Sequence, residues 1–178
     1  NNSFSDTGYY VVSLTEGGIQ MKDIYLAGGC FWGVQEYFSR IDGVVYTEVG
    51  YANGKTKEPD YRSVCTGITG HAETVFVRYD EEKVGLKYLL EKFFRIIDPT
   101  LMNRQGNDIG TQYRTGIYYV DEEDTIVAKA AMDEVQKEYK TPLATELMPL
   151  SYYYPAEDYH QDYLKKNPFG YCHINLNA

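Results

Sequence analysis

The 178-residue chain lacks any apolar run that approaches the roughly 20 residues a membrane-spanning helix needs. It also lacks a block of lysines or arginines, and its 17 basic and 26 acidic residues give a formal charge of -9. Nucleic acids and membrane surfaces are anionic, so we expect neither as a partner of this chain. No break in composition divides the sequence, which predicts one compact domain.

Cysteine is scarce, with Cys30, Cys65 and Cys172 as its three occurrences. An odd number at wide spacing argues against a structural disulfide framework, and no C-x-x-C pair is present for zinc or for dithiol redox chemistry. The three histidines match no zinc spacing either, so we expect no metal site. Each cysteine therefore has to be judged from its own neighbours.

Hydrophobic periodicity predicts an α+β fold that begins near residue 23, after a polar, glycine-dotted stretch expected to be a flexible arm over residues 1–22. Strand, helix, strand, strand, helix, strand is the order of the split βαβ arrangement in ferredoxin-like two-layer cores. The expected domain, residues 23–178, then adds C-terminal helices and an irregular C-terminal segment. The predicted strands are 24–27, 44–51, 73–78, 116–120 and 144–150, and the predicted helices are 31–41, 86–97, 125–140 and 155–166.

The segment G-G-C-F-W-G, residues 28–33, places Cys30 between a predicted strand end and a predicted helix start. Free backbone N–H groups and the helix dipole at such a boundary favour a thiolate over a thiol. The glycines leave the backbone open to a substrate, while Phe31 and Trp32, the only tryptophan, would place aromatic walls beside the sulfur. The alternative interpretation of Cys30 is a buried, inert cysteine.

Further segments complete a pattern in fixed order along the chain. They are V-Q-E (34–36), G-Y-A-N-G (50–54), D-Y-R-S-V-C-T-G (60–67), G-H-A-E (70–73), R-Q-G-N-D-I-G-T-Q-Y-R (104–114), A-E-D-Y-H-Q-D-Y-L (156–164) and N-P-F-G-Y-C (167–172). Together with G-C-F-W-G, this pattern resembles the A-type peptide methionine sulfoxide reductases, which reduce the S epimer of methionine sulfoxide. The resemblance covers residues from about 23 to 174.

The resemblance implies a role for each of several residues. Cys30 would attack the sulfoxide sulfur and become a sulfenic acid, while Glu73 would donate a proton to the oxygen. Such a donor must stay protonated near pH 7, which burial in an apolar pocket can arrange; the alternative for Glu73 is a solvated strand residue. Tyr61 and Tyr113 match the family's hydroxyl donors to the same oxygen.

Three other positions match the family's substrate pocket. Phe31 and Trp32 would hold the S-methyl group, because sulfur and apolar groups both pack well against aromatic rings. Asp108 would orient the substrate or support the tyrosines, with a turn-forming aspartate as the alternative. His160 would belong to a polar network under the pocket.

The resemblance also assigns the second half of the cycle. Cys172 matches the family's resolving cysteine, the thiol that condenses with the sulfenic acid to give a disulfide. Cys65, in V-C-T-G, is the other candidate. No further cysteine follows Cys172, so thioredoxin, or dithiothreitol in an assay, would reduce the disulfide with Cys30 directly, and we expect no cofactor.

Two other functions remain open at this point. One is a cysteine hydrolase or acyltransferase that uses Cys30 with His71 as its base, and the other is a thiol redox-sensing module. The ending G-Y-C-H-I-N-L resembles members that are fused to a B-type reductase, so we expect a domain cut from a longer protein. The resemblance otherwise implies a monomer that repairs free or protein-bound methionine S-sulfoxide in the cytoplasm, with an exported form as the alternative.

Overall fold

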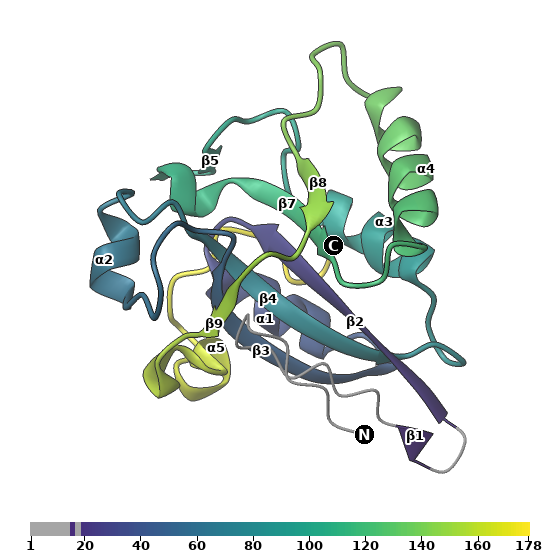
Figure 1. Ribbon diagram of the computed structural model, residues 1–178, viewed down its shortest axis with the longest axis horizontal. Helices are drawn as coiled ribbons and strands as arrows, with labels where there is room; N and C mark the ends of the chain where they lie inside the picture. The colour runs from purple at the N-terminus through teal and green to yellow at the C-terminus, as the bar shows by residue number, and fades with distance from the viewer. Residues whose placement is uncertain (1–14, 17–18) are drawn as a thin grey trace.

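Figure 1 shows the computed structural model, which describes residues 15–16 and 19–178. Four strands form the centre of its main sheet, and their order across the sheet is β7-β2-β4-β3, with every neighbouring pair antiparallel. Helix α1 (Phe31–Ser39) joins β2 to β3, and helix α3 (Leu86–Ile96) lies between β4 and β7 in the chain. The four strands are β2 (Ile19–Gly28), β3 (Val44–Ala52), β4 (Ala72–Asp80) and β7 (Thr115–Tyr119). The predicted α+β class is confirmed, and the strand order is that of a ferredoxin-like core.

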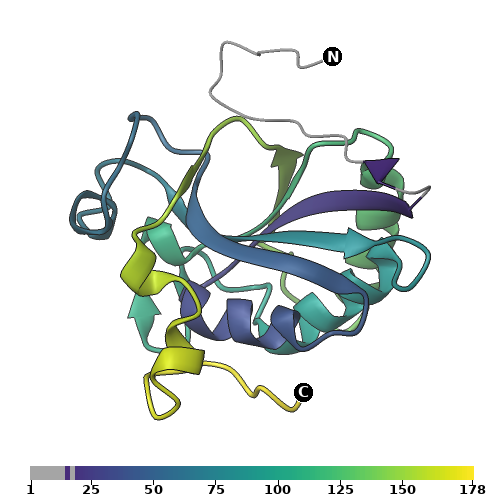
Figure 2. The ribbon, with the colours of Figure 1, turned by 90° about the horizontal axis from the view of Figure 1, so that it is seen from below.

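Helices α1 and α3 cover one face of this sheet (Figure 2). Side chains alternate along a strand, so Ile24 and Leu26 of β2 join the main core under the helices, while Tyr25 and Ala27 join a smaller cluster on the other face. The same alternation in β4 puts Glu73 on the face of Val75, below α1. The fold thereby places an acidic side chain beneath the start of a helix.

Additional elements extend the sheet at its edges. Strand β8 (Glu146–Pro149) runs parallel to β7, and β9 (Tyr153–Pro155) pairs with the outer edge of β3. Helix α4 (Asp124–Gln136) packs against α3. The remaining elements are short: β1 (Thr15–Glu16), α2 (Tyr61–Cys65), β5 (Arg104–Gln105), β6 (Asp108–Ile109), η1 (Thr111–Tyr113), η2 (Asp158–His160) and α5 (Tyr163–Lys166).

The structure differs from the predicted elements at several points. Strand β2 begins at Ile19 because its first half pairs with β1 and with the end of β4, so residues 19–22 belong to the sheet. The rest of the expected arm, 1–14 and 17–18, lies outside the described residues. The helix expected over 155–166 is divided into η2 and α5, because Asp162 between them has a left-handed φ of 50°.

Across the described part of the chain, no helix combines the length and the apolar character that crossing a membrane requires.

Candidate active site

Cys30 lies directly between β2 and α1 and is the N-cap residue of that helix. Gly29 before it has a φ of 85°, which glycine adopts without strain. The Cys30 side chain is only 8% exposed, and this burial, followed by the nearby Glu73 charge, raises the pKa of the thiol despite a hydrogen bond from the Trp32 backbone. In the substrate-free site the pKa of Cys30 is thus shifted in the opposite direction from the one that the helix start predicts.

Glu73 lies at the start of β4 and is 1% exposed, so the alternative of a solvated strand residue is wrong. Its Oε1 accepts the backbone N–H of Phe31 at 3.3 Å, the peptide that immediately follows Cys30. Removal from water raises the pKa of Glu73 to about 8, because burial destabilises the charged form more than this hydrogen bond stabilises it. At pH 7 the carboxyl is therefore mainly protonated and can donate a proton beside the cysteine.

Tyr61 and Tyr113 reach the same region from two different elements, the first residue of α2 and the last residue of η1. Burial raises the pKa of both phenols, and the charge of Glu73 acts on each of them in the same direction. Both hydroxyls are therefore protonated donors across the physiological pH range. The structure brings these two predicted residues together with Cys30 and Glu73.

Glu157 supports the position of Tyr61, although the sequence did not single it out. Its Oε2 accepts the backbone N–H of Tyr61 at 3.3 Å, and its Oε1 accepts the hydroxyl of the fully buried Tyr51 at 3.0 Å. Glu157 therefore fixes the start of α2, where Tyr61 lies, against β3.

Trp32 is held by two contacts of its indole ring. Its Nε1–H donates to Nδ1 of His160 at 3.0 Å, and the ring stacks on Tyr163 with centroids 3.7 Å apart. Because Nδ1 accepts, the neutral His160 carries its proton on Nε2, and burial lowers its pKa. Phe31 is 1% exposed and packs against Tyr51, so it closes the inner end of the site while Trp32 has the more accessible ring.

The C-terminal segment lies across the start of α1. Nε2 of His173 hydrogen-bonds to the carbonyl of Gly28 at 2.9 Å, and a Cβ added to Gly33 would come within 2.9 Å of the Cys172 Sγ. Cys172 therefore packs against the first turn of the helix that Cys30 caps. All three cysteines of the chain are free thiols.

Asp108 makes its hydrogen bond with the C-terminal segment, while its charge adds to the effect of burial in raising the pKa of Tyr113 and of Glu73. Its Oδ2 accepts the hydroxyl of Tyr171 at 2.9 Å, next to Cys172, rather than a hydroxyl of Tyr61 or Tyr113. Asp108 thus anchors the C-terminal segment to β6, a contact that the sequence gave no signal for.

The other candidate residues lie around the edge of the site. Cys65, at the end of α2, is exposed, and in addition to burial it raises the pKa of Tyr61. His71 packs against Tyr154 and fills the space beside Gly54, and no hydrogen bond of the described residues joins it to Cys30. The thiol and imidazole pair expected of a cysteine hydrolase is therefore absent between these two described residues.

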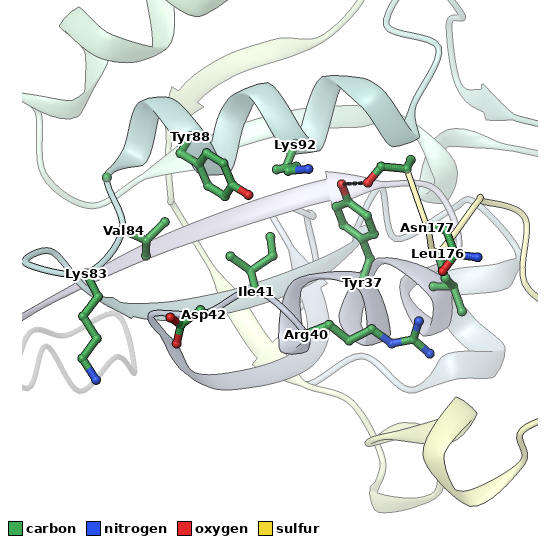
Figure 3. Close-up of a pocket in the computed structure, with 12 residues that line it drawn as sticks. Tyr37, Arg40, Ile41, Asp42, Lys83, Val84, Tyr88, Lys92, Leu176 and Asn177 are labelled. Carbon is green, nitrogen blue, oxygen red and sulfur yellow. Dashed lines mark hydrogen bonds between the residues drawn. The ribbon is translucent and has the colours of Figure 1, made fainter.

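Among the described residues, neither a metal-binding cluster nor the hollow at the other end of α1 involves the site residues. Within residues 15–16 and 19–178, no group of three or more His, Cys, Asp or Glu side chains could hold a metal ion. A hollow of about 580 Å³ lies at the opposite end of α1, where the Tyr37 hydroxyl donates to the carbonyl of Ala178 at 2.9 Å (Figure 3). It contains none of the predicted site residues.

Comparison with known proteins agrees with this geometry. The family model described as peptide methionine sulfoxide reductase matches residues 22–178. The peptide methionine sulfoxide reductase MsrA of Clostridium tetani is 60% identical over 157 residues, which are 88% of this chain and 96% of that protein. The reduced crystal structure of Mxr1 from Saccharomyces cerevisiae superposes with a TM-score of 0.81 at 41% identity, covering 89% of this chain and 91% of that one. The structure of Mxr1 in complex with Trx2 gives a TM-score of 0.59 at 27% identity, over 89% and 90% of the two chains. The chain belongs to the peptide methionine sulfoxide reductase family.

Proposed function

We propose that the protein reduces the S epimer of methionine sulfoxide, free or within polypeptides, to methionine and so repairs oxidised proteins. One observation carries this proposal. The peptide that follows Cys30 is hydrogen-bonded to Glu73, a buried carboxyl whose pKa is raised to about 8 by desolvation. A thiol beside a protonated acid is what sulfoxide reduction needs, because the sulfoxide oxygen must gain a proton before it can leave sulfur.

The first step joins Cys30 to the substrate. Its Sγ forms a bond to the sulfoxide sulfur as Glu73 protonates the oxygen, and the thiol proton replaces the one that Glu73 gives up. The oxygen is transferred to Sγ as the bond to methionine breaks, so Cys30 is oxidised by two electrons to a sulfenic acid and the substrate is reduced by two. Tyr61 and Tyr113 donate hydrogen bonds to the oxygen, where negative charge develops.

The second step regenerates the thiol. The Cys172 thiol condenses with the sulfenic acid, which releases water and leaves a disulfide between Cys30 and Cys172. The packing of Cys172 against the first turn of α1 supports its choice over Cys65, which lies beyond Tyr61 on α2.

Thioredoxin is the proposed reductant of this disulfide, and dithiothreitol replaces it in an assay. The complex of the related Mxr1 with Trx2 supports this partner. We propose no bound cofactor and a monomer acting in the cytoplasm. A fused B-type domain remains a prediction that the Clostridium tetani relative does not support, since this chain already covers 96% of it.

Separate S and R epimers of N-acetylmethionine sulfoxide, with dithiothreitol as reductant, test the proposal. We expect the S epimer alone to be reduced, Cys30→Ser to be inactive, and Cys172→Ser to form one equivalent of methionine per chain when no reductant is added. Mass spectrometry of the oxidised protein should show Cys30 linked to Cys172. Reduction of neither epimer, or hydrolysis of an activated ester by Cys30 without consumption of thiol, would contradict the proposed function.

A further inference from the structure

A groove of about 450 Å³ opens beside the two site tyrosines. One wall is the end of α2 and the loop after it, including Cys65 and Ile68, and the other is the segment from Ile109 to Gln112. Tyr61 begins the helix of the first wall, and Tyr113 directly follows the second. Each wall of the groove therefore belongs to a short element that also carries one of the two site tyrosines.

Contacts join the two walls of the groove to each other and relate them to the two site tyrosines. The Gln112 Nε2 donates to the carbonyl of Cys65 at 3.5 Å, which joins the walls at their base. In addition to burial, Cys65 also raises the pKa of both Tyr61 and Tyr113. The Glu73 charge raises the pKa of the same two tyrosines, so they lie between the groove and Glu73. A methionine sulfoxide side chain held at Glu73 would thus leave its own backbone next to this groove.

The groove is uncharged although the chain is strongly acidic. Ile68 is 81% exposed and Ile109 is 71% exposed, one on each wall, and no residue that lines the groove is charged. Each wall therefore offers one large aliphatic side chain that an apolar group in the groove could contact.

We propose that this groove binds the residues that flank methionine sulfoxide in a polypeptide, and that it selects apolar neighbours; this inference depends on the proposed function. A chain in an extended conformation advances ~3.3 Å per residue, so the one or two residues next to the oxidised methionine fall within a groove of this size. An uncharged groove between two isoleucines favours uncharged aliphatic side chains there. The protein would then prefer oxidised methionines in apolar segments, which are exposed when proteins unfold.

Three substrates in their S-sulfoxide form test the proposal with dithiothreitol as reductant. They are N-acetylmethionine sulfoxide N-methylamide and two pentapeptides with methionine sulfoxide at the centre, flanked either by glycines or by valines. We expect kcat/KM for the valine peptide to exceed that for the glycine peptide ~10-fold, as for an apolar contact of this kind. The double variant Ile68→Ser, Ile109→Ser should lose this preference through a higher KM, with its rate on the single-residue substrate unchanged.

Ile126→Ser is the matched control, since Ile126 is 73% exposed but lies on α4, outside the groove. It should keep the full preference for the valine peptide. A preference that survives the double variant, or an equal loss on all three substrates, would overturn the proposal. So would a loss seen only when thioredoxin replaces dithiothreitol, which would make the groove a docking site for the reductant. If the native protein fails to reduce even the single-residue substrate, the proposed function itself is wrong.

Discussion

At the scale of single residues, the proposed chemistry depends on the protonation of Glu73. Its pKa of about 8 means that the protonated form, which can donate, is present below pH 8 and is lost as the pH rises through that value. We expect the single-turnover rate of methionine formation to fall above pH 8. Glu73→Gln should lower this rate ~100- to 10,000-fold, the usual contribution of a positioned acid, and should remove the inflection near pH 8.

Single-turnover rates of methionine formation, measured by rapid acid quench between pH 6 and 10, check this expectation. A rate that rises to a plateau above pH 8 would contradict it, because Glu73 would then work as a base that first removes the thiol proton. Glu134→Gln, at the exposed ion pair with Lys137 on α4, is a control that should keep the native profile.

The only tryptophan reports on a second titration. Neutral His160 accepts the Trp32 indole N–H through Nδ1, whereas a protonated imidazole has donors on both nitrogens and must release it. Burial lowers the pKa of His160, and Glu157, with Oε2 3.9 Å from Nε2, opposes that shift. We therefore expect Trp32 fluorescence to change in acid, below the ordinary histidine value of about 6.5.

His160→Phe should show no such transition and should raise KM more than it lowers kcat, since Trp32 loses the partner that orients it. An unchanged acid transition in this variant would mean that another group is responsible. Substrate affinity and fluorescence can be measured on the same preparation.

The sequence singled out the proposed reacting residues but not the residues that support them. Cys30 and Glu73 lie in short segments with a recognisable pattern, and the structure places them together. Glu157 and Tyr51 could not be identified, because their link depends on β3 and the segment after β9 meeting in space, 106 residues apart in the chain. The raised pKa of Cys30 was also missed, since burial is a property of the fold rather than of the helix start.

At the scale of elements, the first turn of α1 is built to receive the C-terminal segment. Alanine at position 33 suits a helix better than glycine by up to ~1 kcal/mol, so Gly33→Ala should fold normally. Its Cβ, however, would lie 2.9 Å from the Cys172 Sγ and 3.1 Å from Ile174. We expect one equivalent of methionine to form at the native rate, while disulfide formation slows ~10- to 100-fold because Cys172 is displaced.

The sulfenic acid that accumulates in Gly33→Ala can be trapped with dimedone and counted by mass spectrometry. Gly85→Ala is the matched control, because a Cβ there meets no atom within 4 Å. Equal disulfide rates in the two variants would show that Gly33 does not position Cys172.

The strands and long helices followed from hydrophobic spacing, but the short elements did not. Helix α2 has only five residues and depends on a capping box between Asp60 and Ser63, inside a stretch rich in loop-forming residues. Strand β9 exists because the edge of β3 accepts it. Such elements are set by tertiary pairing, which local sequence does not reveal.

At the scale of the whole molecule, Lys22 ties the sheet to the helix layer. It lies on β2, and its Nζ donates to Asp124, the first residue of α4, whose carboxylate is almost fully buried. Lys22→Met would leave that carboxylate without its cation, and we expect a loss of about 3 kcal/mol in the free energy of unfolding. Urea unfolding measures it.

Asp124→Asn added to Lys22→Met should restore part of that loss, because the uncompensated charge is removed. Lys137→Met, at the exposed Lys137–Glu134 pair, should leave the urea midpoint unchanged. A double variant no more stable than Lys22→Met would show that the buried charge is not the cause.

The space above Gly33 is filled by Cys172 and Ile174, while His173 and Gln105 together fill the space above Gly29. The start of α1 and the C-terminal segment, which also meet where His173 contacts the Gly28 carbonyl from 145 positions along the chain, therefore restrict one another. A relative could accept a larger residue at position 33 only if its C-terminal segment took another route. The position of the second thiol in a family member should thus be readable from the size of the residue at position 33.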